Sequence, residues 1–334
     1  MTWNIFGHDG AVNYFKRQCE PSNTRHAYLI TGPEGVGRLT LAKAFVKALN
    51  CQEPPAKYDF CDKCQACRQI EAEAWPDLTI LRPIENARDI KIDQVRQMQQ
   101  SLALAPYQSQ WRVVIIPDFQ NATVAASNAL LKSLEEPPAR AIIILTADAR
   151  ENLLETIASR CGILRLRPMS VDATAKVLQN KLELEVNEAK KIAHLAGGRV
   201  GTAIHFAQNQ DMLEEYHDTL SQLHEILPET KRARLQYAET VSKRKGNQRE
   251  NVSGLLSVWL TFWRDVMIAH SGADLPIVNL AQSDTVKTIA SQLSLPQIEV
   301  ILKALEKGLE QINANVNSRL VLENILLNIP RLKV

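Results

Sequence analysis

The chain has 334 residues, of which 45% are hydrophobic and 23% charged, and its formal net charge is only +2. This length indicates two or three domains, and the charge balance excludes a polybasic nucleic-acid-binding protein, so any DNA contact must come from a local patch or an assembly. No run of about 20 apolar residues is present, which predicts no transmembrane helix and no membrane partner. The N-terminus lacks the pattern of a signal peptide, and we therefore expect a cytoplasmic protein.

Short β-branched runs alternate with longer helical patterns in the first half of the chain. The predicted strands are Tyr28–Ile30, Leu78–Leu81, Val113–Ile116, Ile142–Leu145 and Ile163–Leu166. This alternation is typical of a parallel sheet with helices on both faces. We therefore predict an α/β domain over residues 1–168.

A glycine-rich loop follows the first predicted strand. Its glycines keep the G-x-x-x-x-G spacing of a phosphate-binding P-loop: Gly32, Gly35 and Gly37. A P-loop continues with a lysine for the outer phosphates and a hydroxyl residue for Mg²⁺, but Arg38 and Leu39 stand here. The planar guanidinium of arginine is no close substitute for a compact ammonium. The loop is either a degenerate nucleotide site or a turn that binds no ligand.

The acidic element of a nucleotide-hydrolysing site is also incomplete. The predicted strand Val113–Ile116 is followed by Pro117 and Asp118, where a working site would have Asp and Glu. A proline cannot contribute to Mg²⁺ binding, and we expect Asp118 to be a solvated acid at a strand end. These losses predict that the chain does not hydrolyse ATP, while nucleotide binding without turnover stays open.

Four of the six cysteines lie within 17 positions, in the pattern C-x9-C-x2-C-x2-C: Cys51, Cys61, Cys64 and Cys67. In a reducing cytosol such a cluster indicates a metal site rather than disulfides. Four thiolates suit a structural, tetrahedral Zn²⁺; an iron–sulfur cluster and four metal-free thiols are the alternatives. Cys19 and Cys161 have no partners in this pattern and are expected to be ordinary buried or helix residues.

The strand signals fade after Pro168, and helical patterns dominate the rest of the chain. We predict a small helical domain over residues 169–210 and a larger helical domain over residues 211–334. The polar run Lys243–Glu250 is expected to be a loop or a frayed turn. Large apolar residues recur at helical spacing in Leu255–Asp265, which favours core packing.

Several motifs in this order resemble the clamp-loader ATPases of bacterial DNA polymerase III, in the AAA+ superfamily. They are Arg25–Pro33, the cysteine insert, Asn128–Pro138, Ser159-Arg160-Cys161 and, more weakly, Asn315–Glu323. The resemblance is strong from about Gly7 to Pro168. It implies an AAA+ P-loop domain with a zinc insert at residues 51–67, then a helical lid and an all-α collar. Zn²⁺ is the metal that it favours.

The resemblance also implies roles for individual residues. Arg160 corresponds to the arginine finger that reaches into the ATP site of a neighbouring subunit; the alternative is a surface arginine paired with Glu155 or Glu151. In the lid, Gly197–Thr202 places Val200 where an arginine normally senses nucleotide, although Arg199 is adjacent. The Leu130, Leu131 and Leu134 stripe is expected to serve packing and subunit contact, and some of Trp259, Phe262 and Trp263 could contact partners.

These features together predict a non-hydrolysing clamp-loader subunit without catalysis of its own. The implied partners are the gamma/tau and delta subunits, the sliding clamp and, through the assembly, primed DNA. One rival is an active gamma-like AAA+ ATPase that tolerates Arg38. A second is a zinc-dependent DNA-binding module, which the near-neutral charge disfavours because phosphate contacts dominate such binding.

Overall fold

The computed structural model describes residues 3–84, 87–243 and 247–332, and the chain forms two compact units. The first comprises Met1–Met169 together with Arg199–Thr202, and the second comprises Ser170–Gly198 and Ala203–Val334. The finer division at residues 168 and 210 into three domains stays a prediction.

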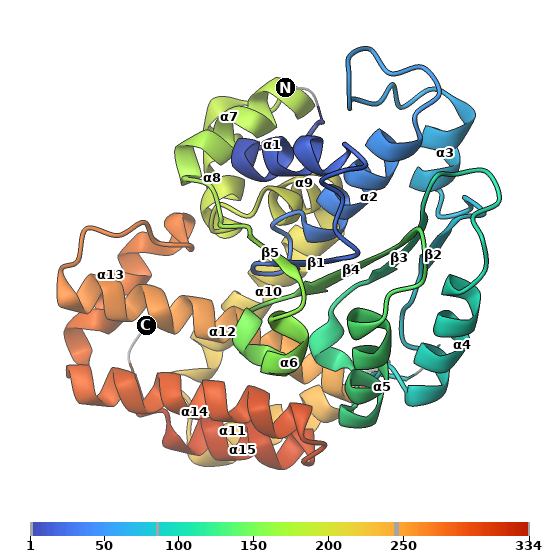
Figure 1. Cartoon of the computed structure of the whole chain (residues 1–334). Coiled ribbons are helices and arrows are strands. Elements are labelled where there is room, and N and C mark those ends of the chain that lie inside the picture. Colours follow the sequence, from blue (N-terminus) through green and yellow to red (C-terminus); the bar gives the residue numbers. More distant parts are fainter. Residues whose placement is uncertain (1–2, 85–86, 244–246, 333–334) are drawn as a thin grey trace. The chain divides into compact units, whose positions relative to one another are not determined.

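A parallel sheet forms the centre of the first unit (Figure 1). Its strands are β1 (Ala27–Thr31), β2 (Leu78–Ile80), β3 (Arg112–Ile116), β4 (Ala141–Ala147) and β5 (Gly162–Arg165). Their order is β2-β3-β4-β1-β5, and every neighbouring pair is parallel. The five predicted strands are thus confirmed, with ends that differ by one or two residues.

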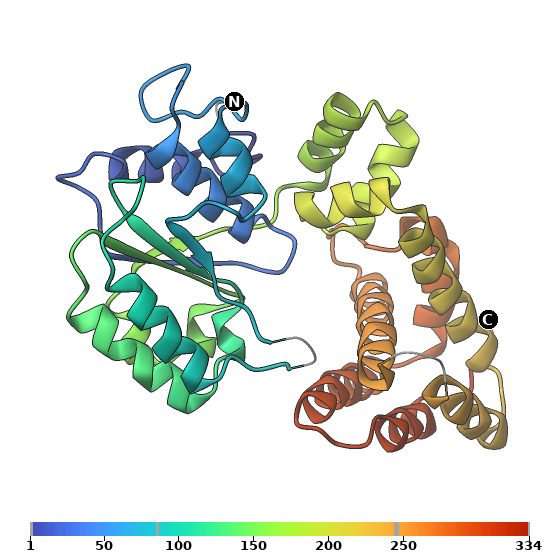
Figure 2. The same ribbon diagram turned by 90° about the vertical axis from the view of Figure 1, so that its right-hand side faces the viewer.

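Helices cover both faces of this sheet (Figure 2). They are α1 (Asp9–Gln18), α2 (Arg38–Asn50), α3 (Gln65–Glu71), α4 (Ile92–Leu102), α5 (Val124–Glu135) and the short α6 (Glu155–Ala158). Because strand side chains alternate between faces, Tyr28 and Ile30 pack with α1–α3 in one apolar core, whereas Leu29 packs with α4–α6 in another. Leu130 and Leu134 of α5 are buried in that second core.

The parallel arrangement gives the sheet two chemically different edges. At the carboxyl edge, where all strands end, the glycine loop follows β1, Asp118 follows β3 and Asp148 follows β4. Ligands of open α/β sheets bind outside this edge. The opposite edge, where all strands begin, is called the amino edge below.

The second unit is helical in its described residues. Its helices are α7 (Val171–Leu182), α8 (Val186–Leu195), most of α9 (Val200–Gln208), α10 (Gln210–Ile226), α11 (Lys231–Ser242), α12 (Gln248–Ser271), α13 (Ser283–Gln292), α14 (Leu295–Asn313) and α15 (Ser318–Asn328). A small core joins α7–α9 and a larger one joins α10–α15. Of the predicted loop at 243–250, residues 244–246 lie outside the described chain, and Gln248–Glu250 already belong to α12.

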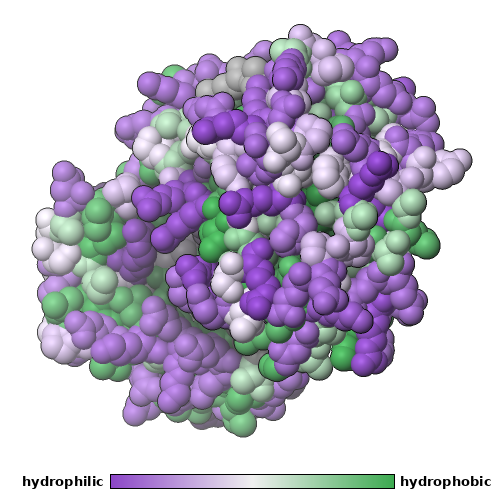
Figure 3. Space-filling model, in the orientation of Figure 1, coloured by the Kyte–Doolittle hydropathy of each residue, from purple (hydrophilic) through white to green (hydrophobic). Residues whose placement is uncertain are grey.

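Helix α12 forms the centre of the larger core. Trp259, Phe262 and Trp263 are fully buried there, so core packing is the correct interpretation and none of the three is available to a partner. Among the described helices, α12 is also the one long and apolar enough to span a membrane. Because half of that apolar window is buried within the protein, this is weak evidence for a membrane span. The face seen in Figure 3 is largely hydrophilic, with hydrophobic residues in small groups.

The buried side chain of Arg234 ties three helices of the second unit together. Its guanidinium donates hydrogen bonds to the carbonyls of Ile226 and Leu227 at the end of α10. It also donates to three carbonyls at and beyond the end of α15, those of Leu326, Ile329 and Pro330. The C-terminal end of a helix leaves carbonyls without intrahelical partners. The side chain of Arg234 supplies hydrogen-bond donors to such carbonyls at the ends of both α10 and α15.

We expect Arg234→Lys to lower the stability of the protein by about 2–4 kcal/mol, because an ammonium has three donors and cannot reach five carbonyls. Urea unfolding followed by circular dichroism would measure the change. Arg232→Lys, on the exposed side of the same helix, is the matched control and should change stability by less than about 0.5 kcal/mol. Equal stability of the two variants would contradict this role for Arg234.

Candidate functional site

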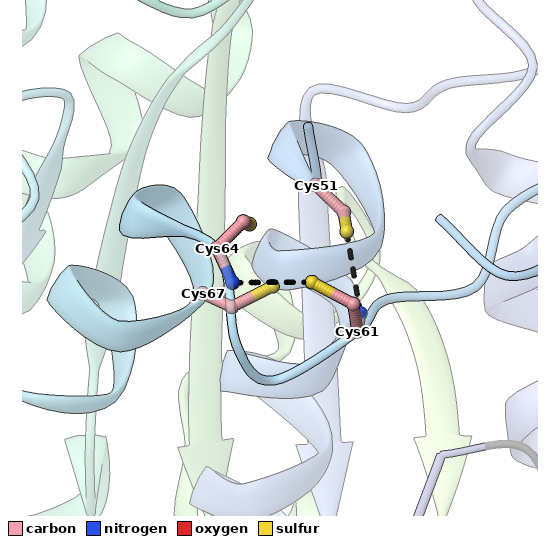
Figure 4. A group of neighbouring side chains, drawn as sticks. All are labelled: Cys51, Cys61, Cys64 and Cys67. Atoms are coloured by element: carbon pink, nitrogen blue, oxygen red, sulfur yellow. Dashed lines mark hydrogen bonds between the residues drawn. The ribbon is translucent and has the colours of Figure 1, made fainter. Parts of the chain in front are cut away.

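The four clustered cysteines come together where α2 ends and α3 begins (Figure 4). Cys51 directly follows α2, Cys61 lies in the connecting loop, Cys64 directly precedes α3, and Cys67 lies in its first turn. Their sulfur atoms all lie within 4.8 Å of one another. In a tetrahedral site with bonds of about 2.3 Å, sulfurs lie about 3.8 Å apart. The four cysteines can therefore hold a metal ion after small side-chain rotations.

Backbone N–H groups already support these sulfurs as acceptors. Cys61 N donates to Cys51 Sγ at 3.3 Å, and Cys64 N donates to Cys61 Sγ at 3.2 Å. Burial raises the pKa of Cys64, but hydrogen bonds from the backbone of Cys67 and Gln52 outweigh burial, and its pKa lies at about 6. The local backbone thus favours the thiolate form at Cys64, which is the form that binds metals, whereas burial raises the pKa of Cys51 and Cys67.

Ion pairs fix the cysteine loop to the rest of the first unit. Lys47 of α2 pairs with Asp62 at 2.6 Å and with Glu71 at 2.7 Å, so the loop and α3 are both held to α2. Lys16 of α1 pairs with Asp59, whose side chain is 5% exposed, at 2.6 Å. Cys19 and Cys161 are buried away from the cluster, as expected.

The glycine loop joins β1 to α2 in a backbone conformation that requires glycine. Gly35 and Gly37 have φ angles of +76° and +104°, which side-chain-bearing residues rarely adopt. Gly35 also contacts the segment that begins α9, because its carbonyl accepts a hydrogen bond from Gly201 N at 2.9 Å. A Cβ on Gly35 would lie 1.9 Å from Thr202 Oγ1. Val200, the residue predicted at the sensor position, is buried beside this contact.

The side chain of Arg38 bridges two carboxylates at the carboxyl edge. Its Nη2 lies 2.8 Å from Asp118 Oδ1 and its Nη1 lies 2.6 Å from Asp148 Oδ1. The arginine side chain is only 8% exposed, whereas the two carboxylates are about half exposed. The guanidinium is therefore already paired with two acids of its own chain, and each of these acids already has a cationic partner.

Asp118 is half exposed at the end of a strand, as expected, but it is also an ion-pair partner, which the sequence did not predict. Its backbone N–H donates to Thr146 Oγ1 at 3.0 Å. Sequence reasoning missed Asp148 entirely. Its position directly after the buried run Ala141–Ala147 was the available signal, because side chains that follow adjacent parallel strands meet at the carboxyl edge.

Arg160 lies at the amino edge of the same sheet, two residues before β5. Its Nη2 pairs with Glu135 Oε1 at 2.8 Å, and its Nη1 donates to the carbonyl of Thr156 at 2.8 Å. The pairing predicted as an alternative, with Glu155 or Glu151, is not the one present, because Glu155 pairs with Arg150. The arginine side chain is 36% exposed, so solvent or a partner can reach it.

Two models of DNA polymerase III subunit families match successive parts of the chain. A family model described as "DNA polymerase III, delta subunit" matches residues 7–170, and one described as "DNA polymerase III, delta subunit, C terminal" matches residues 210–331. The chain is 25% identical to DNA polymerase III subunit delta' of Bacillus subtilis over 311 residues, which cover 92% of each protein.

Two further relatives match over shorter lengths. DNA polymerase III subunit delta' of Pseudomonas aeruginosa is 36% identical over 53% of this chain and 54% of its own. DNA polymerase III subunit gamma of Buchnera aphidicola is 27% identical over 67% of this chain and 62% of its own. The matches thus include delta' and gamma proteins.

We expect Arg38→Gln to lower the stability of the full chain by about 1–3 kcal/mol, because Asp118 and Asp148 lose their shared cation. Millimolar Mg²⁺ or Mn²⁺ should restore part of the loss, since paired carboxylates bind such ions, whereas the wild-type protein should not respond. Scanning calorimetry with and without the metal measures both effects.

The double variant Arg38→Gln/Asp118→Asn is the matched control, because it removes one of the two carboxylates and should abolish the metal response. An Arg38→Gln variant that unfolds at the wild-type temperature would show that the two ion pairs contribute nothing.

Proposed function

Because this chain belongs to the delta' family of DNA polymerase III subunits, we propose that it acts in the clamp loader as a non-hydrolysing subunit that completes a neighbour's ATP site. The observation that carries this proposal is the contrast between the two edges of the sheet. Arg38 is bound by two acids of its own chain at the carboxyl edge, while Arg160 is accessible at the amino edge.

Hydrolysis needs a metal ion and a cation at the outer phosphates. Arg38 is buried in its ion pairs, Leu39 has no oxygen for Mg²⁺, and Pro117 replaces the acid beside the metal. Gly32, Gly35 and Gly37 would supply only backbone N–H groups to a phosphate. We therefore infer that the chain binds ATP weakly or not at all.

Arg160 can act on an ATP molecule held by another subunit. A guanidinium near the γ-phosphate stabilises the charge that spreads over the phosphoryl oxygens during transfer. Arg160 first has to leave Glu135, which holds it in the isolated chain. Exchange of one anion for another leaves the guanidinium paired in both states, and the released carboxylate of Glu135 is half exposed, so water can solvate it.

For the cysteine cluster we propose a structural Zn²⁺ held by Cys51, Cys61, Cys64 and Cys67. Four protein sulfurs fill a tetrahedral shell and leave no position for a substrate. The ion would fix the loop that Lys47 and Lys16 already hold from two sides. An iron–sulfur cluster is the chemical alternative, and elemental analysis separates the two.

The proposed partners are the gamma/tau and delta subunits, the sliding clamp and primed DNA, and the proposed location is the cytoplasm. Residues 211–334 are expected to provide the collar that holds the ring, and residues 169–210 the lid. Because the chain also matches a gamma protein, an active ATPase is the alternative function. ATP turnover by the isolated chain would reveal it.

In a complex reassembled with gamma/tau and delta subunits, Arg160→Ala is expected to slow hydrolysis at the neighbouring site by about 10³-fold or more, because the finger is lost. ATP turnover in the presence of the clamp and primed DNA measures this, and the isolated chain should show no turnover. Arg150→Ala, which removes a nearby arginine paired with Glu155, is the matched control. Unchanged turnover in the Arg160→Ala complex would disprove the finger role.

We expect about one zinc ion per chain, measured by elemental mass spectrometry of protein purified without added metal. Cys64→Ser should lose the ion and unfold at lower temperature, because a tetrahedral site with three sulfurs is weakened. Cys19→Ser, a buried cysteine outside the cluster, should retain the zinc. Iron in place of zinc would contradict the assignment of the metal, and the absence of any metal would contradict the site.

A further inference from the structure

The amino edge of the sheet gathers three arginines from distant parts of the sequence. Arg140 directly precedes β4, Arg25 lies two residues before β1, and Arg160 lies two residues before β5. Strands β4, β1 and β5 are neighbours and parallel, so the residues that precede them lie at the same edge. The motif resemblance accounts for Arg160 and leaves the other two arginines without a role.

These arginines line one pocket of about 490 Å³. Its walls also include His26, Trp111 and Pro138. Arg25 and Arg140 are exposed, and the backbone of Arg140 is held in the left-handed region, with φ at +60°. That backbone conformation costs about 1 kcal/mol for a residue with a side chain and is fixed in part by a hydrogen bond from Arg112 N to Arg140 O at 2.8 Å.

The pocket has more positive than negative charge. Glu135 pairs with Arg160, and among the described carboxylates none forms an ion pair with Arg25 or Arg140. Three positively charged residues line this one pocket, and an anion that enters reduces the repulsion between their charges. The flat fork of arginine matches the geometry of phosphate oxygens, which it can bind through two hydrogen bonds.

We propose that Arg25 and Arg140 form, with Arg160, a binding pocket for the polyphosphate chain of the nucleoside triphosphate that a neighbouring subunit presents. This inference rests on the proposed function of Arg160 and extends it to two further residues. Arg160 acts on the charge that develops during hydrolysis, while Arg25 and Arg140 hold the phosphate chain before and during the reaction. Glu135 competes with the phosphates for Arg160.

Binding to the full chain tests the pocket without any partner subunit, with inorganic tripolyphosphate as the probe in calorimetry at low ionic strength. Arg25→Gln and Arg140→Gln should each weaken binding about tenfold, because each removes charge-assisted hydrogen bonds. Glu135→Gln should tighten binding, because it removes the competing carboxylate. Arg96→Gln, an exposed arginine on α4 outside the pocket, should bind like the wild-type protein.

Arg25→Lys and Arg140→Lys keep the charge without the fork and should lie between the wild-type and glutamine variants. Circular dichroism would verify that every variant is folded. A wild-type chain that does not bind tripolyphosphate, or Arg25→Gln and Arg140→Gln variants that bind it as tightly as the wild type, would overturn the pocket.

The reassembled complex tests which phosphate fills the pocket. Arg25→Gln and Arg140→Gln should raise the KM for ATP several-fold with a smaller change in kcat, whereas Arg160→Ala should lower kcat.

If Arg160→Ala lowers kcat and the two glutamine variants behave like the wild type, the inference fails and the finger role stands. If Arg160→Ala has no effect, the finger role itself fails. If the glutamine variants weaken DNA binding and leave the KM for ATP unchanged, the pocket binds nucleic acid and our assignment is wrong.

Discussion

The parallel direction of all five strands is the constraint on which the chemistry of the first unit depends. It brings every strand end to one edge and every strand start to the other, so residues far apart in sequence meet in two separate places. The carboxyl edge collects the glycine loop, Asp118 and Asp148, and the amino edge collects Arg25, Arg140 and Arg160. One sheet thereby carries charged residues at two opposite edges, and the residues at one edge can change while those at the other stay the same.

The change from lysine to arginine after the glycine loop has a structural effect that charge alone does not explain. A lysine would present one ammonium to a phosphate, whereas the fork of Arg38 reaches two carboxylates at once. Those acids follow adjacent strands, which places them at the right separation for the fork. Both acids therefore have a cationic partner without nucleotide or metal. Gly201 of the segment that begins α9 also lies against Gly35 of the loop.

The sheet, its flanking helices and the cysteine cluster could be predicted from sequence because each has a local signal. Buried strands such as β3 and β4 are nearly continuous apolar runs, and the repeated two-residue spacing between Cys61, Cys64 and Cys67 is rare by chance. The partners of Arg38 and Arg160 could not be predicted. Asp148 lies 110 positions from Arg38, and Glu135 is 25 positions from Arg160, so both pairings depend on the order of strands in the sheet. That order is a tertiary property, and no local pattern specifies it.

The ion pairs of Arg38 also determine which measurement detects a harmful substitution in this protein. In a hydrolysing subunit, substitutions around the glycine loop abolish activity while the fold persists. Here the same positions hold the carboxyl edge together, so their substitution produces a protein that unfolds more easily. Substitution of Arg160 should instead leave the stability of the protein nearly unchanged, because an exposed side chain contributes little to stability. A screen of the isolated chain by thermal stability would therefore find the structural positions and overlook Arg160, whose proposed role only an assembled complex can test.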